Sequence, residues 1–562
     1  TSAKLPSYAL YPVYHSTEKL TSAGLNSKGI SKIIQSLLAL LNKSLAENLS
    51  LEIIDKFQFL TREKSFFGIH FPSNVDELNQ SAFRLKFEEL FFLQIAVLKQ
   101  KYLRKRKIKS FIFKKVGDKF NMFYRNHISF ELTNAQKRVM KEIRLDVLSG
   151  FQMNRLLQGD VGSGKTIIAI MSILLAHDNG FQSCLMAPTD ILANQHFNSI
   201  VKFADSLDLK IALLTGKTKS KIKQKILLDL KNNSIDLIIG THALIQENVA
   251  FCNLGLAIID EQHKFGVSQR SKLWINNHVV PHVLVMTATP IPRTLAMTAY
   301  GDLDVSVIDE LPPNRKSILT THKYAKDMRQ VYGFLETELK KNKQVYIVYP
   351  LIEESKVLDY QNLFDGYKQT QNFFSQKDVQ ISIMHGRLSK EEKETEMNKF
   401  INQETQIMVA TTVIEVGVNI PNATIMVIQN AERFGLSQLH QLRGRVGRGT
   451  DKSYCFLITS NKLTNDAKTR IKAMVESSDG FNIAEIDLKI RGPGDILGTR
   501  QSGLIHFKLA SLVKDQQILQ MARKEAGNIL DKDFELLHYQ NKPISRHFKK
   551  YHAKLLKWGL VS

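Results

Sequence analysis

The sequence predicts an α/β protein with two parallel-sheet units in tandem, preceded by a helical region and followed by a small, mainly helical region. Short β-rich runs alternate with helical ones from about Phe130 to Leu311, which is the pattern of a parallel sheet wrapped by helices. A second block with the same alternation follows the break at residues 312–315, Pro-Pro-Asn-Arg. Two similar α/β units joined by a hinge or linker are the economical interpretation of this repetition.

The elements are expected in a simple order along the chain. Up to about Asn126 the apolar residues recur at helical spacing, as from Ile30 to Leu38, and a longer apolar and charged stretch runs from Glu77 to about Arg106. The chain turns helical again after the glycine-rich residues 491–495. The expected domains are residues 1–128, 129–313, 314–475 and 476–562. The expected strands are residues 183–187, 211–214, 236–239, 256–259 and 283–286 in the first block, and residues 344–349, 379–384, 406–410, 423–428 and 454–458 in the second.

The composition favours a polyanionic partner. Of the 562 residues, lysine and arginine (77) exceed aspartate and glutamate (54) by 23. An anionic membrane surface is the other interpretation of this surplus, but no apolar stretch approaches the roughly 20 residues of a spanning helix. The N-terminus lacks the basic-then-apolar build of a signal peptide, so we expect a cytoplasmic protein. Cys184, Cys252 and Cys455 have no paired spacing and are expected to be buried, reduced thiols.

A phosphate-binding loop is the clearest single motif. Residues 159–166 read Gly-Asp-Val-Gly-Ser-Gly-Lys-Thr, after the apolar pair Leu156 and Leu157. Glycines let backbone N–H groups converge on phosphate oxygens, and the helix that follows adds its positive N-terminal end. Lys165 would pair with the β- and γ-phosphates and the Thr166 hydroxyl would ligate Mg²⁺. The residues expected to hold the nucleotide phosphates in this loop are Gly159, Gly162, Ser163, Gly164, Lys165 and Thr166.

Further candidates follow other expected strands. Asp260 fits a direct or water-mediated Mg²⁺ role, and Glu261 is then placed to orient or deprotonate the attacking water. Thr287 and Thr289 end another buried strand, where they could sense the site or belong to an ordinary turn. Upstream, Phe130 and Gln136 could hold a purine base, although Gln136 could equally be an exposed helix residue. A triphosphate bound with its metal is the first functional expectation.

Arginines in the second α/β block indicate the functional class of the protein. Residues 438–448 read Gln-Leu-His-Gln-Leu-Arg-Gly-Arg-Val-Gly-Arg, in which glycines would let the backbone approach a ligand. An arginine placed against the γ-phosphate accelerates phosphoryl transfer by about 10³- to 10⁵-fold. Arg445 and Arg448 are the candidates. With the phosphate loop in the first α/β block, ATP would lie between the two blocks. Its hydrolysis would open and close the cleft between them, which is the geometry of a motor.

The same residues resemble superfamily-two helicases and translocases. The resemblance covers residues from about 130 to 449 and includes nearly every motif of that group. The motifs are the phosphate loop, Ala-Pro-Thr at 187–189, Gly-Thr-His at 240–242, Asp-Glu-Gln-His at 260–263, Thr-Ala-Thr-Pro at 287–290, Ala-Thr-Thr at 410–412, Glu-Val-Gly-Val at 415–418 and residues 441–448.

A narrower resemblance is to the RecG family of bacterial fork-remodelling helicases. It is carried by Asp-Glu-Gln-His-Lys-Phe-Gly-Val at 260–267, Thr-Pro-Ile-Pro-Arg-Thr at 289–294 and Asp-Glu-Leu-Pro-Pro at 309–313. Residues 487–495 and 498–503 are similar to a translocation motif that this family shares with the transcription-repair coupling factor Mfd. In the N-terminal region, residues 10–14 and 84–90 also match the RecG family.

The resemblance implies two RecA-like helicase domains and a DNA-dependent ATPase driven by Mg-ATP. The implied activity is translocation on double-stranded DNA, with remodelling of stalled replication forks and branch migration of Holliday junctions in DNA repair and recombination. The implied partners are double-stranded and branched DNA, with single-strand-binding protein as a candidate, and the implied state is a monomer. The resemblance adds Gly417 to the nucleotide site, and it assigns coupling or DNA contacts to Gln262, His263, Thr287, Thr289, Thr411, Arg491 and Gln501.

Several alternatives stay open at this point. An Mfd-like translocase is disfavoured because the N-terminal matches are to the RecG family, and a DNA-binding protein with an inactive nucleotide site is disfavoured because every expected catalytic residue type is present. In the RecG family the matched N-terminal residues follow an oligonucleotide-binding wedge, whose β-rich sequence is not found before Thr1, as expected of a fragment. The basic run from Lys101 to Lys115, with Phe111 and Phe113, could bind duplex DNA or form a solvated face.

Overall fold

The computed structural model describes most of the chain, and the described residues form two compact units. The described residues are 10–41, 45–246, 248–261, 279–289, 303–312, 316–350, 356–411, 420–447, 449, 451–491 and 507–552, with the backbone only at 104–107, 356–362, 390, 491 and 552. The first unit consists of Thr1–Arg104, Arg293–Asp302 and Arg491–Ser562, and the second of Lys105–Pro292 and Leu303–Ile490. The first unit is helical where it is described, and both sheets belong to the second.

The first unit joins the long helix α5 to a segment near the C-terminal helices. The Glu89 carboxylate accepts the backbone N–H groups of Lys508, Leu509 and Ala510 at 2.9, 3.1 and 2.9 Å. Because these bonds are charge-assisted, they fix the C-terminal segment firmly against the N-terminal helix that carries Glu89. The helices of this unit are α1 (Glu18–Ser22), α2 (Ser27–Leu40), α3 (Leu51–Phe57), α4 (Arg62–His70), α5 (Val75–Lys107), α21 (Gln516–Lys532) and α22 (Lys542–His547).

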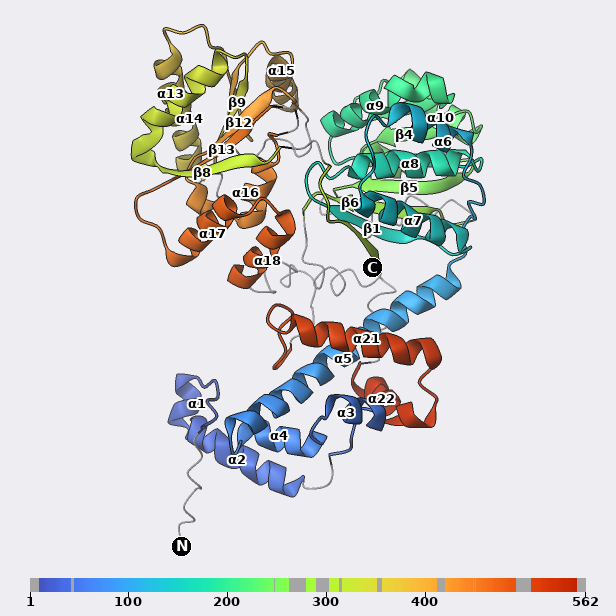
Figure 1. Cartoon of the computed structure of the whole chain (residues 1–562), viewed down its shortest axis with the longest axis vertical. Coiled ribbons are helices and arrows are strands. Elements are labelled where there is room, and N and C mark those ends of the chain that lie inside the picture. The colour runs from blue at the N-terminus through green and yellow to red at the C-terminus, as the bar shows by residue number, and fades with distance from the viewer. Residues whose placement is uncertain are drawn as a thin grey trace. The chain divides into compact units, whose positions relative to one another are not determined.

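The first sheet of the second unit has seven parallel strands in the order β3-β4-β2-β5-β6-β1-β7. Figure 1 labels β4, β5, β6 and β1 of this sheet. Its inner strands β1, β2, β4 and β6 are buried along their whole length, as expected for a parallel sheet that helices cover on both faces. The strands are β1 (Asn154–Gly159), β2 (Gln182–Met186), β3 (Ile211–Leu214), β4 (Leu237–Gly240), β5 (Leu254–Asp260), β6 (His282–Thr287) and β7 (Asp304–Ile308), and the helices are α6 (Asp118–Met122), α7 (Asn134–Leu148), α8 (Lys165–His177), α9 (Asp190–Ala204) and α10 (Ser220–Lys231).

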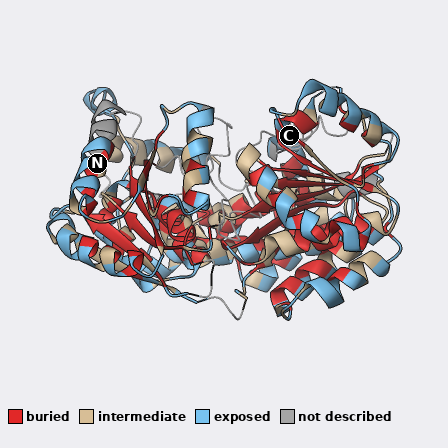
Figure 2. Cartoon of the chain, turned by 90° about the horizontal axis from the view of Figure 1, so that it is seen from above, coloured by how far each residue is buried: buried red, intermediate tan, exposed pale blue. Residues whose placement is uncertain are grey.

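The second sheet has six parallel strands in the order β10-β11-β9-β12-β13-β8. Its inner strands β9, β11 and β12 are buried along their whole length, and Figure 2 shows the sheets as mostly buried and the outer faces of the helices as exposed. The strands are β8 (Ile318–Tyr324), β9 (Gln344–Tyr349), β10 (Ile381–Met384), β11 (Ile407–Thr411), β12 (Ala423–Ile428) and β13 (Ser453–Thr459), and the helices are α13 (Met328–Leu339), α14 (Lys356–Phe374), α15 (Lys390–Ile401), α16 (Leu436–Arg443), α17 (Asn465–Glu476) and α18 (Gly480–Arg491).

The predicted fold class is confirmed, and so are the strands expected in both blocks. Two strands were not expected, β7 and β8. Both lie at the edge of their sheet, and both mix apolar with polar or half-exposed positions, so no continuous apolar run marks them. The expectation of three buried thiols is wrong for Cys252, which is exposed, whereas Cys184 and Cys455 are buried. Cys252 lies in the bend before β5, where the chain is still at the surface.

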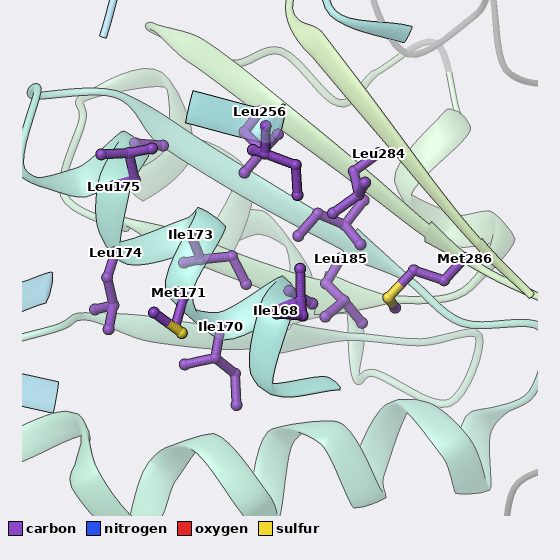
Figure 3. Packing of buried hydrophobic residues seen from close by; sticks show 14 of the residues in the cluster. Ile168, Ile170, Met171, Ile173, Leu174, Leu175, Leu185, Leu256, Leu284 and Met286 are labelled. Carbon is purple, nitrogen blue, oxygen red and sulfur yellow. The ribbon is translucent and has the colours of Figure 1, made fainter. Parts of the chain in front are cut away.

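The first sheet is the part of the fold that positions the site. Strands β5, β6 and β1 are neighbours, and their register places Asp260 beside Met286, and Thr287 beside Gln158. Because the strands are parallel, their carboxyl ends meet at one edge. The loop after β1, the acidic pair after β5 and the threonine that ends β6 therefore share that edge. Apolar side chains of α8 and of the strands pack beneath it, among them Ile168, Leu185, Leu284 and Met286 (Figure 3).

The core of the first sheet should respond strongly to a truncation at Leu284. This side chain is fully buried on β6, between β5 and β1, so Leu284→Ala should lower the free energy of unfolding by about 2 to 5 kcal/mol. Leu228→Ala is the control, since Leu228 is 58% exposed on α10 and should change stability by less than about 0.5 kcal/mol. Denaturant unfolding followed by circular dichroism measures both, and equal effects would contradict the packing described.

Candidate functional site

The phosphate-binding loop joins β1 to α8 and has the backbone that its glycines allow. Gly162 and Gly164 have φ angles of +77° and +91°, in the left-handed region that side chains with a Cβ rarely adopt. A Cβ on Gly164 would lie 2.2 Å from the Nε2 atom of Gln136. Space and conformation both require glycine at this position, and α8 begins at the next residue, Lys165, with its N–H groups at the loop.

Lys165 is folded back onto this loop. Its Nζ atom donates to the carbonyl oxygens of Gly159 at 2.9 Å and Asp160 at 2.8 Å. The ammonium group thus lies inside the turn where a phosphate would be cradled. The Ser163 hydroxyl, also in the loop, is buried and has no hydrogen-bond partner among the described residues. Both groups can turn to phosphate oxygens without breaking a strand or helix bond.

The acidic pair lies at the end of β5. Asp260 accepts the backbone N–H of Glu261 at 3.1 Å through Oδ1, and its Oδ2 atom lies 2.9 Å from Nε2 of His196. Glu261 has a φ of +56° and is 5% exposed, and its Oε2 accepts the N–H of Ala288 at 3.4 Å. Burial and the neighbouring Asp260 carboxylate raise the pKa of Glu261 above its ordinary value, against the opposing charges of Lys165 and Arg445.

His196 is a residue of the site that sequence reasoning missed. It lies on α9 and is 6% exposed. Because a carboxylate only accepts hydrogen bonds, the imidazole Nε2 must carry the proton and donate to Asp260. Helical spacing could have found it, since His196 lies four residues after the buried Leu192 and four before the buried Ile200, which places it on the inward face of the helix.

The threonines and the glutamine lie around the same edge. Thr287 and Thr289 share a hydrogen bond of 2.6 Å between their hydroxyls at the end of β6. Gln136 is fully buried, which excludes the alternative of an exposed helix residue. Its Nε2 donates to the carbonyl of Ser163 at 2.9 Å, and its Oε1 accepts the N–H of Thr133, so it braces the phosphate loop. Phe130 is half-buried against the core of the first sheet.

The two described arginines of the second sheet's motif have different surroundings. Arg443 donates to three carbonyls at the end of α17, those of Met474, Ser477 and Ser478, so its role is structural. Arg445 is 4% exposed, and its Nη1 atom is buried without a hydrogen-bond partner among the described residues. Burial lowers the pKa of Arg445, and the charges of Glu261 and Asp260 oppose that shift. Arg445 therefore lies near enough to the acidic pair for their charges to interact.

Asp160 of the phosphate loop connects the two sheets. Its Oδ1 lies 2.5 Å from Nε2 of His440 on α16, and its Oδ2 accepts the N–H of Gly480 at 3.3 Å. The other ring nitrogen of His440, Nδ1, lies 2.9 Å from Nη2 of Arg443, which can only donate. The His440 proton is thus on Nε2 and points to Asp160. The loop that would bind phosphate is tied in this way to the helix that precedes Arg445.

Other predicted positions are described only in part. Thr411 ends β11, is fully buried, and its hydroxyl has no partner among the described residues. Gln262, His263, Gly417, Arg448 and Gln501 lie outside the described residues, as does the side chain of Arg491. In the basic run, Phe113 is 1% exposed and packs in the first core, so it cannot stack on DNA. The roles of these positions stay predictions.

Family models match residues 133–298 as a DEAD/DEAH box helicase, residues 326–450 as a helicase conserved C-terminal domain, and residues 477–562 as the C-terminal part of domain 3 of the ATP-dependent DNA helicase RecG. The chain is 45% identical to the ATP-dependent DNA helicase RecG of Streptococcus pneumoniae over 92% of its own length and 76% of that protein. The chain belongs to the RecG family.

Other RecG proteins are similarly close in sequence, and the chain spans about two thirds of the length of some of them. The RecG protein of Synechocystis is 47% identical over 93% of this chain, which covers 62% of that relative, and that of Thermotoga maritima is 45% identical over 94%, covering 66%. A solved structure of RecG bound to a three-way DNA junction matches with a TM-score of 0.69 and 42% identity, over 91% of this chain and 66% of that one. Among the described residues, no helix is both long and apolar enough to cross a membrane.

The left-handed glycine of the phosphate loop gives a sharp test of the site. Gly164→Ala should weaken the binding of a fluorescent ATP analogue because the new Cβ would displace Gln136 and the loop. Gly180→Ala is the matched control, since Gly180 has a similar φ of +79° but a Cβ there would meet no atom of the described residues within 4 Å. Both variants should lose about 1 to 2 kcal/mol of stability from the strained backbone. Equal nucleotide affinity in the two variants would contradict the site.

Proposed function

We propose that this chain is a motor that uses Mg-ATP to translocate on double-stranded DNA and to remodel branched DNA, including stalled forks and Holliday junctions. The observation that carries the proposal is the meeting of four groups at one sheet edge: the phosphate loop, the acidic pair, the threonines of β6 and the buried Arg445. A nucleotide there would be in contact with residues of both sheets. Hydrolysis would then change how the two sheets engage each other.

The residues at the edge suit a Mg²⁺ ion carried by the nucleotide. Mg²⁺ in such sites takes one or two protein ligands together with phosphate oxygens and water. Among the described residues, Asp260 uses each carboxylate oxygen in only one hydrogen bond, so lone pairs remain for a metal or its water. Thr166, at the start of α8, supplies a hydroxyl. The ion would neutralise charge on the β- and γ-phosphates.

Glu261 and Arg445 have complementary tasks in this proposal. Glu261 would orient the attacking water and accept its proton, and its raised pKa makes it a stronger base than an ordinary carboxylate. Arg445 would place its guanidinium against the charge that develops on the γ-phosphate. Because Arg445 belongs to the second sheet, hydrolysis would depend on the engagement of both sheets.

Two observations support DNA as the track. The chain has a formal net charge of +23, which favours binding to a phosphate backbone. The solved RecG relative with 42% identity is bound to a three-way DNA junction. Backbone amides and hydroxyls after the strands, in residues 187–189 and 240–242, would position phosphates without reading bases.

ATP hydrolysis with and without DNA tests the proposal directly. The chain should hydrolyse ATP faster when duplex or three-way junction DNA is added, and Lys165→Ala should abolish turnover because the phosphates lose their ammonium partner. A chain that binds DNA but never hydrolyses ATP would instead be a DNA-binding protein with an inactive nucleotide site. Retained DNA-stimulated turnover in Lys165→Ala would also contradict the assignment.

Kinetic measurements on variants of Arg445 and of the control residue Arg433 should distinguish a catalytic arginine from an exposed one. Arg445→Gln should lower kcat by on the order of 10³-fold or more while leaving ATP binding nearly unchanged, since its proposed interaction is with the transition state. Arg433→Gln is the control, because Arg433 is an exposed arginine beside the same helix. Thermal unfolding should establish that both variants are folded. A loss confined to KM would argue against the role given to Arg445.

A substitution at Gln501 should affect branch migration and ATP hydrolysis differently. We expect Gln501→Ala to keep DNA-stimulated ATP hydrolysis and to lose branch migration, because the resemblance gives this residue a part in translocation. A junction labelled on opposite arms measures branch migration, and release of phosphate measures hydrolysis. Equal loss of both activities would count against a coupling role.

A further inference from the structure

Helix α9 has contacts on three sides. At its start, the Thr189 hydroxyl accepts the N–H of Leu192 at 3.3 Å and caps the helix. The next residue, Asp190, accepts a hydrogen bond of 3.4 Å from the hydroxyl of Thr241, which follows β4. The beginning of the helix is therefore fixed to the carboxyl ends of two strands, β2 and β4.

The second contact is with the other sheet. Ile191, the second residue of α9, packs against the core cluster that underlies β9 to β13 and α16. Among the described residues of this cluster, Ile191 alone comes from the helices of the first sheet, and all the others lie at or after Ile318. A change in how the two sheets engage would act directly on the start of α9.

The third contact is with the acidic pair. His196 donates from Nε2 to Oδ2 of Asp260 at 2.9 Å, while the N–H of Glu261 occupies Oδ1 at 3.1 Å. The carboxylate is thus held from two sides, one of which is a backbone group of its own strand and the other a side chain of α9. The N–H of Glu261 directly follows β5, so its position is set by the sheet. His196 is the group that a shift of α9 would move.

The two residues are close enough along α9 for a displacement of one to move the other. Ile191 and His196 are five residues apart, which is about 7 to 8 Å along a helix that rises 1.5 Å per residue. Packed helices shift as rigid bodies rather than bending over such a length. A shift at Ile191 therefore becomes a shift of His196 and of the carboxylate that it holds.

We propose that His196 is a positioning residue that sets the orientation of the Asp260 carboxylate toward the metal of the bound nucleotide, and that α9 makes this orientation depend on the contact of Ile191 with the second sheet. The inference rests on the proposed function and deepens it, since it gives DNA-driven engagement of the sheets a path to the metal site. If His196 bonded to Asp260 only to satisfy its own buried ring nitrogen, the hydrogen bond would still form. The metal site would then not depend on Ile191.

The first experiment measures metal dependence without hydrolysis. A fluorescent ATP analogue is bound to each variant of the full chain while Mg²⁺ is titrated, with EDTA as the metal-free reference. His196→Leu keeps volume but removes the donor, and it should need roughly 10-fold more Mg²⁺ for half-maximal binding, in the range seen when a partner of a metal ligand is lost. His196→Gln, whose Nε2 can donate at a similar reach, should restore most of the affinity, and Asn198→Ala, exposed on the same helix, should match the wild type.

The outcomes are distinct. If His196→Leu requires no more Mg²⁺ than the wild type, or if His196→Gln is as defective as His196→Leu, the positioning role is wrong. Weaker binding of the analogue in EDTA by His196→Leu would indicate general damage to the site and would also overturn the role. This measurement does not depend on hydrolysis, so it stands even if the chain fails to turn over ATP with DNA.

The second experiment tests the path through α9. Ile191→Ala should raise the Mg²⁺ concentration needed for half-maximal binding of the analogue, but by less than His196→Leu, because α9 loses its contact with the second sheet while His196 keeps its hydrogen bond to Asp260. It should lower the stimulation of ATP hydrolysis by DNA about twofold or more, the range expected when one contact of a coupling path is removed. Full DNA stimulation in Ile191→Ala would contradict the path while leaving the positioning role of His196 to the first experiment. Absence of stimulation in the wild type would instead contradict the proposed function.

Discussion

The adjacency of β5, β6 and β1 in a parallel sheet is the constraint on which the site depends. Parallel pairing brings the carboxyl ends of these strands to one edge, although the acidic pair follows the phosphate loop by about a hundred residues along the chain. Backbone hydrogen bonds of the sheet fix that edge, and only side chains remain free to respond. Lys165, Asp260 and Glu261 can therefore exchange partners when a nucleotide binds without any strand being broken.

Much of the fold could be predicted from the sequence because parallel strands are buried on both faces and read as apolar runs. The runs that became β2, β5 and β9 needed no tertiary information. The edge strands β7 and β8 could not be recognised, since most of their positions are polar or partly exposed. Cys252 illustrates the same limit, because its exposure depends on a bend before β5 and not on its residue type.

The site divides in a similar way. Glycine-rich and acidic motifs predicted which residues meet at the edge, because phosphate and metal chemistry restricts the residue types that can serve. The sequence named Arg445 and not Arg443 as a candidate, but it did not predict that Arg443 would donate to the carbonyls at the end of α17, because that contact joins separate segments of the chain. Nor did it predict His196 or the pairing of Asp160 with His440, because each joins segments that are far apart along the chain.

A crystal structure of the chain with Mg²⁺ and a non-hydrolysable ATP analogue would test the central claim most directly. We expect Lys165 to leave the carbonyls of Gly159 and Asp160 for the β- and γ-phosphates, and the metal to lie between those phosphates, Thr166 and Asp260. Arg445 should approach the γ-phosphate from the second sheet. A nucleotide bound elsewhere, or one bound with Lys165 still on the loop carbonyls, would contradict the account.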